Sequence, residues 1–135
     1  MHADIDVLIR AARDARESAY APYSKFRVGA ALLTKDARVF SGCNVENASY
    51  GLSNCAERTA LYSAIAAGYR PGDFTHLVVI GDCDGPIAPC GACRQVMIEL
   101  GGAQLVVVRT NLRGAIMKTT AAMLLPDAFS LDPSG

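Results

Sequence analysis

The sequence predicts an α/β fold, a three-layer α/β/α sandwich built on a mixed sheet of about five strands. The chain has 135 residues, the length of one ordinary domain. The wholly apolar segments 77–80 and 105–108 are typical of strands buried on both faces of a sheet. A helical segment lies between them, and strand–helix–strand units favour parallel pairing with helices on both sheet faces. We therefore expect residues 1–135 to form a single domain.

The first elements expected along the chain are a helix and an antiparallel hairpin. Over residues 4–19 apolar side chains recur at steps of three and four residues, which predicts an amphipathic helix. Pro22 stops it, because proline disfavours the helical conformation of the residue before it. The short polar turn 34–37 then joins two expected strands, 27–33 and 38–44. This antiparallel pair is the reason that the sheet is expected to be mixed.

Helices and strands alternate over the rest of the chain. The second and third helices are expected over residues 55–67 and 91–100, and a glycine follows each of them. The apolar strand 77–80 comes after the second helix, and the strand 105–108 comes after the third. A short last helix over residues 120–125 is cut off by the proline that follows it.

Composition and charge exclude several classes of protein. Thirteen Lys and Arg residues balance thirteen Asp and Glu residues, so the chain lacks the positive excess of nucleic-acid and anionic-membrane binders. Hydrophobic residues make up 51% and charged residues 19%, which excludes intrinsic disorder. The mean hydropathy of +0.21 is high for a small domain. We therefore expect part of the apolar surface to be buried between subunits.

The cysteine content and the start of the chain predict a cytoplasmic location. The first residues lack the basic patch, apolar core and small-residue cleavage site of a signal peptide. No apolar run reaches the roughly 18 residues of a membrane span. Five cysteines, an odd number, are typical of a cytosolic metal or redox site rather than of a disulfide framework.

Three of the cysteines are spaced as metal ligands. Cys55 and Cys90 fall at expected helix starts, where partial positive charge and free amide donors favour the thiolate, and Cys93 lies one turn after Cys90. Zinc with three protein ligands keeps a fourth position for water, as catalytic sites do, whereas structural zinc is closed by four. Glu57 lies two residues after Cys55, near enough to take a proton from such a water. Arg58 could hydrogen-bond the thiolates and reduce their negative charge.

The spacing of the cysteines leaves other interpretations open. The Cys90-x-x-Cys93 pair alone also fits a thioredoxin-like redox pair or half of a structural zinc knuckle. A fourth thiolate from Cys43 would close the metal site and remove the catalytic interpretation. A zinc-stabilised binding module without catalysis is a rival hypothesis, and Glu57 opposes it because a structural site needs no carboxylate at that position.

The same residues carry a resemblance to a known family. Cys-x-Glu at residues 55–57 and Pro-Cys-x-x-Cys at residues 89–93 fit the three-cysteine form of the zinc-dependent base deaminase signature. More narrowly, the chain resembles the small homotetrameric cytidine deaminases in five segments, which are residues 23–32, 42–48, 55–60, 89–96 and 124–129. The resemblance spans nearly the whole chain in the order of the family.

The resemblance implies the fold, cofactor and reaction of that family. One zinc ion per chain would be held by Cys55, Cys90 and Cys93, with Glu57 as the proton shuttle. A zinc-bound hydroxide would attack C4 of the pyrimidine. Cytidine and 2′-deoxycytidine would thus become uridine and 2′-deoxyuridine with release of ammonia, a step of pyrimidine salvage. The implied partners are a small pyrimidine nucleoside and further copies of the chain in a cytoplasmic homotetramer, with neither nucleic acid nor a membrane.

Six substrate-contacting residues are implied by the resemblance: Phe26, Asn44, Glu46, Tyr50, Ala56 and Phe129. Asn44 and Glu46 lie two apart on an extended segment, so they face one side, and they would bind the ribose hydroxyls. Phe26 and the backbone of Ala56 would lie at the base. Tyr50 and Phe129 would complete the pockets of neighbouring subunits. A carboxylate at the sugar would repel a phosphate, which favours a free nucleoside over a nucleotide.

Residue type alone supports plainer roles for several of these side chains. Asn44 could cap a turn, Glu46 could be a solvated charge, and the aromatic side chains could be packing residues. A rival substrate for the same chemistry is a cytosine nucleoside antibiotic of the blasticidin type. Ala88 also departs from the family, which often has serine before the Pro-Cys pair, so the finer substrate preference stays open.

Overall fold

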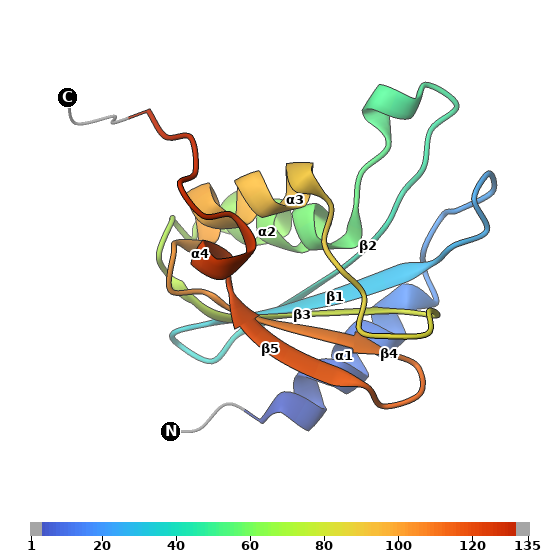
Figure 1. Ribbon diagram of the computed structural model, residues 1–135, viewed down its shortest axis with the longest axis horizontal. Coiled ribbons are helices and arrows are strands. Elements are labelled where there is room, and N and C mark those ends of the chain that lie inside the picture. Colours follow the sequence, from blue (N-terminus) through green and yellow to red (C-terminus); the bar gives the residue numbers. More distant parts are fainter. Residues whose placement is uncertain (1–3, 132–135) are drawn as a thin grey trace.

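The computed structural model describes residues 4–131, in which helices cover both faces of a sheet (Figure 1). Its helices are α1 (Ile5–Arg16), α2 (Ala56–Ala66), α3 (Gly91–Val96) and α4 (Ala121–Leu124), with a 3₁₀ turn η1 (Tyr50–Leu52) and a π-helical turn η2 (Met97–Gly101). Its strands are β1 (Val28–Thr34), β2 (Val39–Cys43), β3 (Phe74–Gly81), β4 (Val106–Asn111) and β5 (Ile116–Thr120). The first three residues, at which the sequence predicts no signal peptide, lie outside the described range.

The sheet has five strands within residues 4–131, in the order β2-β1-β3-β4-β5. Strand β1 pairs antiparallel with β2 and β3, and β5 pairs antiparallel with β4. Strands β3 and β4 form the parallel pair, which is joined through α3. Helix α1 covers one face of the sheet, and α2 and α3 cover the other (Figure 1). The predicted α/β/α sandwich with a mixed sheet of about five strands is confirmed.

Several element boundaries differ from the sequence prediction, which placed no strand over residues 116–120. Strand β5 lies at the edge of the sheet and its first three residues are exposed, so it lacks the apolar run that marks a buried strand. The predicted short helix begins one residue later, because Thr120 caps it and accepts a hydrogen bond from the amide of Met123 at 3.2 Å. The helix predicted over residues 91–100 changes at Met97 from α-helix to the π-helical turn η2.

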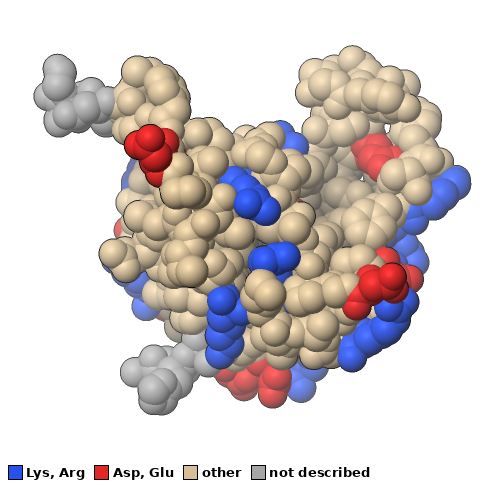
Figure 2. All heavy atoms as spheres, viewed as in Figure 1, with Lys and Arg blue, Asp and Glu red and all other residues tan. Residues whose placement is uncertain are grey.

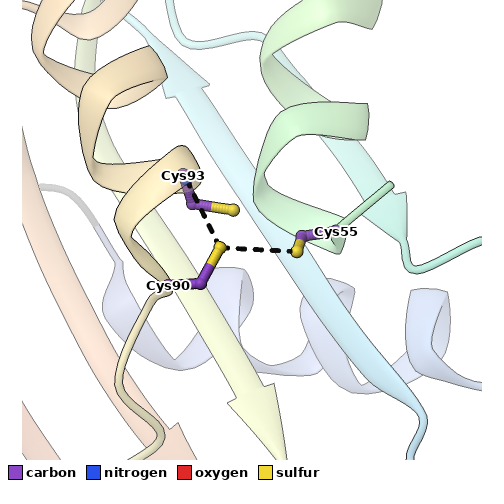
Figure 3. Close-up of side chains that lie close together, drawn as sticks. All are labelled: Cys55, Cys90 and Cys93. Atoms are coloured by element: carbon purple, nitrogen blue, oxygen red, sulfur yellow. Dashed lines mark hydrogen bonds between the residues drawn. The ribbon is translucent and has the colours of Figure 1, made fainter. Parts of the chain in front are cut away.

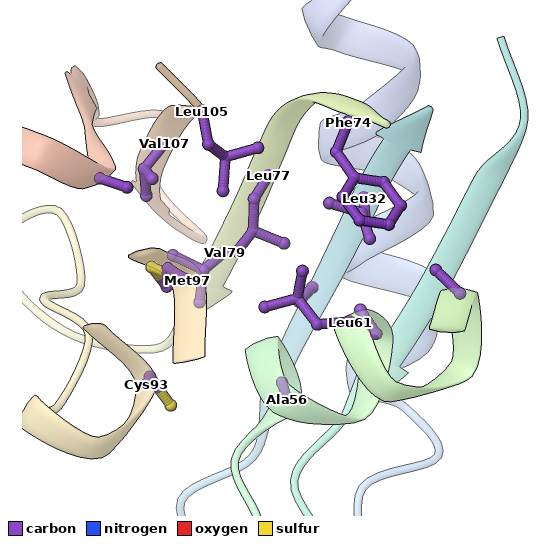
Figure 4. Packing of buried hydrophobic residues seen from close by; sticks show 14 of the residues in the cluster. Leu32, Ala56, Leu61, Phe74, Leu77, Val79, Cys93, Met97, Leu105 and Val107 are labelled. Carbon is purple, nitrogen blue, oxygen red and sulfur yellow. The ribbon is translucent and has the colours of Figure 1, made fainter. Parts of the chain in front are cut away.

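The core is divided by the sheet into two apolar clusters. The smaller cluster lies under α1 and includes Leu8, Ala12, Val78, Ile80 and Val108. The larger cluster lies under α2 and α3 and includes Leu32, Ala56, Leu61, Val79, Cys93, Met97 and Val107 (Figure 4). Because alternate residues of a strand point to opposite faces, neighbours such as Val107 and Val108 serve different clusters.

Helix α2 packs directly on β2 at Gly42. A Cβ atom at Gly42 would lie 2.5 Å from the carbonyl oxygen of Ala56 and 2.5 Å from the amide nitrogen of Ala60. The absent side chain therefore lets the first turn of α2 rest on the sheet backbone. This contact fixes where α2 begins, and Cys55 is the N-cap residue of that helix.

The surface carries charges of both signs. On the face shown in Figure 2, Lys and Arg are scattered among Asp and Glu rather than gathered in one stripe. The same face is hollowed between a projecting loop and the rest of the molecule. Among residues 4–131, none of the helices has the length and apolar content needed to cross a membrane.

Candidate metal centre and active site

Three cysteine side chains from two helix starts meet at one point (Figure 3). Cys55 is the N-cap of α2, Cys90 is the N-cap of α3, and Cys93 lies in the first turn of α3. The Sγ atoms of Cys55 and Cys90 are 3.7 Å apart, and all three sulfurs lie within 4.8 Å of one another. Sulfurs bonded to a tetrahedral zinc at about 2.3 Å lie about 3.8 Å apart. The spacing and the soft donor set therefore fit zinc.

The helix starts favour negative charge on these sulfurs. The amide of Cys93 donates to the Cys90 Sγ at 3.5 Å, as the free amides of a first helical turn can do. A hydrogen bond with the Cys93 thiol, supported by Arg58 and Cys90, lowers the pKa of Cys55 below its ordinary value. The pKa of Cys93 is raised by the same partnership with Cys55 and by burial. The interaction between the two side chains therefore favours the thiolate at Cys55 over the thiolate at Cys93.

Arg58 lies beside the sulfur cluster, where the sequence placed it. Its guanidinium Nη2 donates to the Cys55 Sγ at 3.3 Å. Its Nε is buried and has no hydrogen-bond partner among the described residues. A cation at this place reduces the net negative charge that three thiolates would give the site.

Glu57 is buried beside the cysteines, in the first turn of α2. Its side chain is 4% exposed, although most glutamates lie at the surface. Burial raises the pKa of Glu57 to about 7, and the negative charge of Cys55 raises it too, while a bond with the Cys93 side chain lowers it. A carboxyl group with a pKa near neutrality can both take and give a proton.

Asn44 and Glu46 lie at the end of β2 and bind neighbouring backbone. The Asn44 Oδ1 accepts from the amide of Val28 at 2.8 Å, and its Nδ2 donates to the carbonyl of Phe26 at 2.8 Å. The amide group keeps one donor hydrogen and one acceptor lone pair for a ligand. Glu46 accepts from the amide of Ser24 at 3.1 Å and from its hydroxyl. The Ser24 hydroxyl lowers the pKa of Glu46, which therefore stays ionised at neutral pH.

A cavity of about 350 Å³ opens next to Glu46. Its lining residues are Tyr23, Ser24, Glu46, Asn47, Tyr50 and Ser53. It lies between two loops, one that follows α1 and one that follows β2. The cysteines are not among the lining residues, so this cavity and the sulfur cluster are separate parts of the candidate site.

Phe26 lies over the carboxyl end of β3. A Cβ atom at Gly81 would lie 3.0 Å from the Phe26 ring and 2.8 Å from the Cδ1 of Ile87. Both side chains thus pack against the glycine backbone, and Phe26 is 38% exposed. Ala56 is fully buried at the start of α2 (Figure 4).

Residues 3–109 match the family described as the cytidine and deoxycytidylate deaminase zinc-binding region. The chain belongs to this family. The cytidine deaminase of Halalkalibacterium halodurans is 54% identical over 129 residues, which is 96% of each chain. The cytidine deaminase of Sporosarcina psychrophila is 52% identical over 127 residues, covering 94% of this chain and 92% of that one. The crystal structure of cytidine deaminase from Burkholderia pseudomallei has a TM-score of 0.93 and 67% identity, covering 94% of this chain and all of that one.

Membership in the deaminase family agrees with the sulfur cluster. The matched region is zinc-binding, and Cys55, Cys90 and Cys93 form a group that could hold a metal ion. Cys43 is not part of that group within residues 4–131. The chain is therefore an enzyme of the zinc-dependent deaminase family.

Two predicted residues of the deaminase are largely exposed. Tyr50 is 81% exposed and Phe129 is 69% exposed. The segments that carry them lie on opposite sides of the molecule in Figure 1. Within one chain, the structure does not bring these two aromatic rings together.

Two further residues of the candidate site were missed by the sequence analysis. Ser24 holds Glu46, and Ile87 faces Phe26 across Gly81. Each acts through a contact between segments far apart in the chain, for which local spacing gives no signal. Ser24 lies in the family-like segment 23–32 and just after the expected end of the first helix, but no role in the site was assigned to it.

Proposed function

We propose that the chain hydrolyses cytidine and 2′-deoxycytidine to uridine and 2′-deoxyuridine with release of ammonia, in pyrimidine salvage. The observation that carries this proposal is the buried carboxyl group of Glu57 beside the three-sulfur cluster. The names of the relatives support cytidine as a substrate. The deoxynucleoside and the salvage role extend the proposal beyond those names.

The proposed chemistry divides between the metal and Glu57. Zinc held by Cys55, Cys90 and Cys93 would activate water as the nucleophile towards C4 of the base. Glu57 takes the proton of that water and delivers it to N3. It then takes the proton of the new hydroxyl at C4 and delivers it to the amino group, which leaves as ammonia while the C4 carbonyl forms. One carboxyl group can serve as base and then as acid because its pKa lies near neutrality.

The ribose is held by Asn44 and Glu46 in this proposal. Asn44 has one donor and one acceptor left after its bonds to backbone, and Glu46 offers an ionised carboxylate. Phe26 packs beside the base, and the amide of Ala56, which lies in the first turn of α2, binds it. Arg58 supports the ligand set through Cys55.

The test is turnover of cytidine by the zinc-loaded protein. Turnover is measured as loss of ultraviolet absorbance and as release of ammonia. No turnover by a fully metallated preparation would contradict the proposal and favour a binding module. A panel of cytosine nucleosides, including a blasticidin-type antibiotic, measures the preference among substrates.

The charge of Glu46 predicts that cytidine monophosphate is a poor substrate. We expect its kcat/KM to lie about tenfold or more below that of cytidine, because a phosphate adds negative charge near the carboxylate. Glu46→Gln is the matched variant, and the difference in kcat/KM between cytidine and cytidine monophosphate should be smaller in it than in wild type. Equal kcat/KM values for both substrates in the wild-type enzyme would contradict this role of Glu46.

We further propose that residues 1–135 form one deaminase domain that assembles into a cytoplasmic homotetramer. The large exposed fractions of Tyr50 and Phe129 support burial of these rings by a neighbouring subunit. The five cysteines are all free, which supports a reducing compartment. Light scattering measures the assembly, and a stable monomer would contradict it.

A further inference from the structure

Arg109 is a half-buried cation that projects from β4 beneath the loop 82–89. Its Nε donates to the carbonyl of Ile87 at 2.9 Å, and its NH2 donates to the carbonyl of Pro86 at 3.4 Å. Its NH1 lies 3.0 Å from the sulfur of Met117 on β5. Among residues 4–131, none of the ion pairs includes Arg109. The guanidinium group therefore serves the loop rather than an acidic partner.

The loop 82–89 is attached to the carboxyl end of β4 along its length. The amide of Ile87 donates to the carbonyl of Thr110 at 3.2 Å. The side chain of Asn111 donates to the carbonyls of Cys83 and Asp84 at 2.9 Å and 3.1 Å. Asn111 thus holds the end of the loop near β3, and Arg109 holds the end near α3.

The end of the loop held by Arg109 leads into both halves of the candidate site. The side chain of Ile87 packs against Gly81 next to the ring of Phe26. Cys90 follows three residues later, with its sulfur 3.7 Å from that of Cys55. A shift of the carbonyls of residues 86 and 87 would therefore move the Ile87 side chain next to Phe26 and the sulfur of Cys90 together.

We propose that Arg109 is a positioning residue, which fixes Ile87 beside Phe26 and Cys90 opposite Cys55 by binding the carbonyls of Pro86 and Ile87. The inference rests on the proposed function, because it assigns Phe26 to the base and Cys90 to the metal. Arginine suits the task, since its planar fork donates to two neighbouring acceptors at once. Methionine at this position would fill similar space and leave both carbonyls without these donors.

The test compares Arg109→Met with Arg113→Met in the zinc-loaded full chain. Arg113 is the matched control, because it is exposed and contacts the same loop at Cys83 and Asp84, far from Cys90. In Arg109→Met we expect about tenfold faster hydrogen exchange at the amides of Ile87 and Ala88 and about tenfold faster zinc release to a chelator. The KM for cytidine should rise by more than kcat falls. Arg113→Met should stay within about twofold of wild type in all of these measurements.

Exchange and zinc release that agree within about twofold between the two variants would overturn the proposal. These two measurements do not depend on turnover, so they decide the role of Arg109 even if the wild-type chain fails to deaminate cytidine. If Arg109→Met does not fold, Arg109→Lys decides, because lysine keeps the charge but loses the fork. We expect exchange at the amides of Ile87 and Ala88 to be faster in Arg109→Lys than in wild type, and identical exchange would overturn the proposal.

Discussion

At the scale of single residues, the candidate site contains a buried carboxyl group, that of Glu57, although burial of a carboxylate is energetically unfavourable. Glu57 is 4% exposed, and burial raises its pKa to about 7. The charge of Cys55 also raises the pKa of Glu57, whereas the guanidinium of Arg58 lowers it. A group in this environment contributes less to stability than a well-packed apolar residue would. The proton transfer proposed for Glu57 would account for its presence here.

Glu57→Gln tests the proton transfer directly. The amide keeps the size of the side chain but cannot take a proton, so we expect kcat for cytidine to fall by about 10²–10⁴-fold. Zinc content, measured by atomic emission, should stay at the wild-type value because Glu57 is not proposed as a ligand. Near-normal kcat in the metallated variant would refute the proton shuttle.

Cys90→Ala and Cys43→Ala form a matched pair that tests the ligand set. Removing Cys90 leaves two sulfurs at the cluster, so zinc per chain should fall sharply. Cys43 lies outside the cluster and burial raises the pKa of its thiol, so Cys43→Ala should keep its zinc. Full zinc occupancy in Cys90→Ala, or loss of zinc in Cys43→Ala, would show that the ligand set is wrong.

At the scale of elements, the starts of α2 and α3 place the three cysteines and Glu57. The close contact of α2 with Gly42 on β2 holds the first of these helices. The helix starts at Cys55 and Cys90 could be predicted because N-terminal signals are local in sequence. Strand β5 could not, since an exposed edge strand needs only its partner β4 and no apolar run of its own. The π-helical turn after Val96 and the contact of Ile87 with Gly81 also depend on packing between distant segments. Local sequence signals thus predicted the elements that bring the three cysteines together, but not the contacts between distant segments around them.

Gly42→Ala tests the contact that seats α2. The added methyl would meet backbone atoms of Ala56 and Ala60 at 2.5 Å, so helix and sheet must separate. We expect the free energy of unfolding to fall by about 1–3 kcal/mol in urea denaturation. Gly51→Ala is the control, since a Cβ there has no heavy atom within 4 Å, and its effect should stay within about 0.5 kcal/mol. Equal stabilities of the two variants would contradict the close packing.

At the scale of the whole molecule, the free energy of unfolding depends on charges far from the site. His76 lies on β3, and burial, together with the charge of Lys118, lowers its pKa below the ordinary 6.5. The unfolded chain therefore binds more protons than the folded chain between the folded pKa and 6.5. The free energy of unfolding should rise with pH through this window. Above pH 6.5 the titration of His76 should no longer change it.

His76→Gln isolates this contribution, because glutamine does not titrate. Urea denaturation of both proteins between pH 5 and pH 8 measures the difference in unfolding free energy. This range extends about 1.5 pH units on either side of the ordinary pKa of histidine. We expect wild type to lose stability relative to the variant as the pH falls below 6.5. A difference that is constant over this range, or that grows in the opposite direction, would contradict the lowered pKa of His76.

The three sulfurs also join segments that the chain itself leaves apart. Cys55 and Cys90 are 35 residues apart in sequence and belong to different helices. An ion bound between them acts as a removable cross-link, which resists unfolding much as a disulfide does, without needing an oxidising environment. The stability of the fold and the proposed catalysis would then depend on the same three sulfurs. Removing zinc would therefore lower the free energy of unfolding and abolish the proposed activity together.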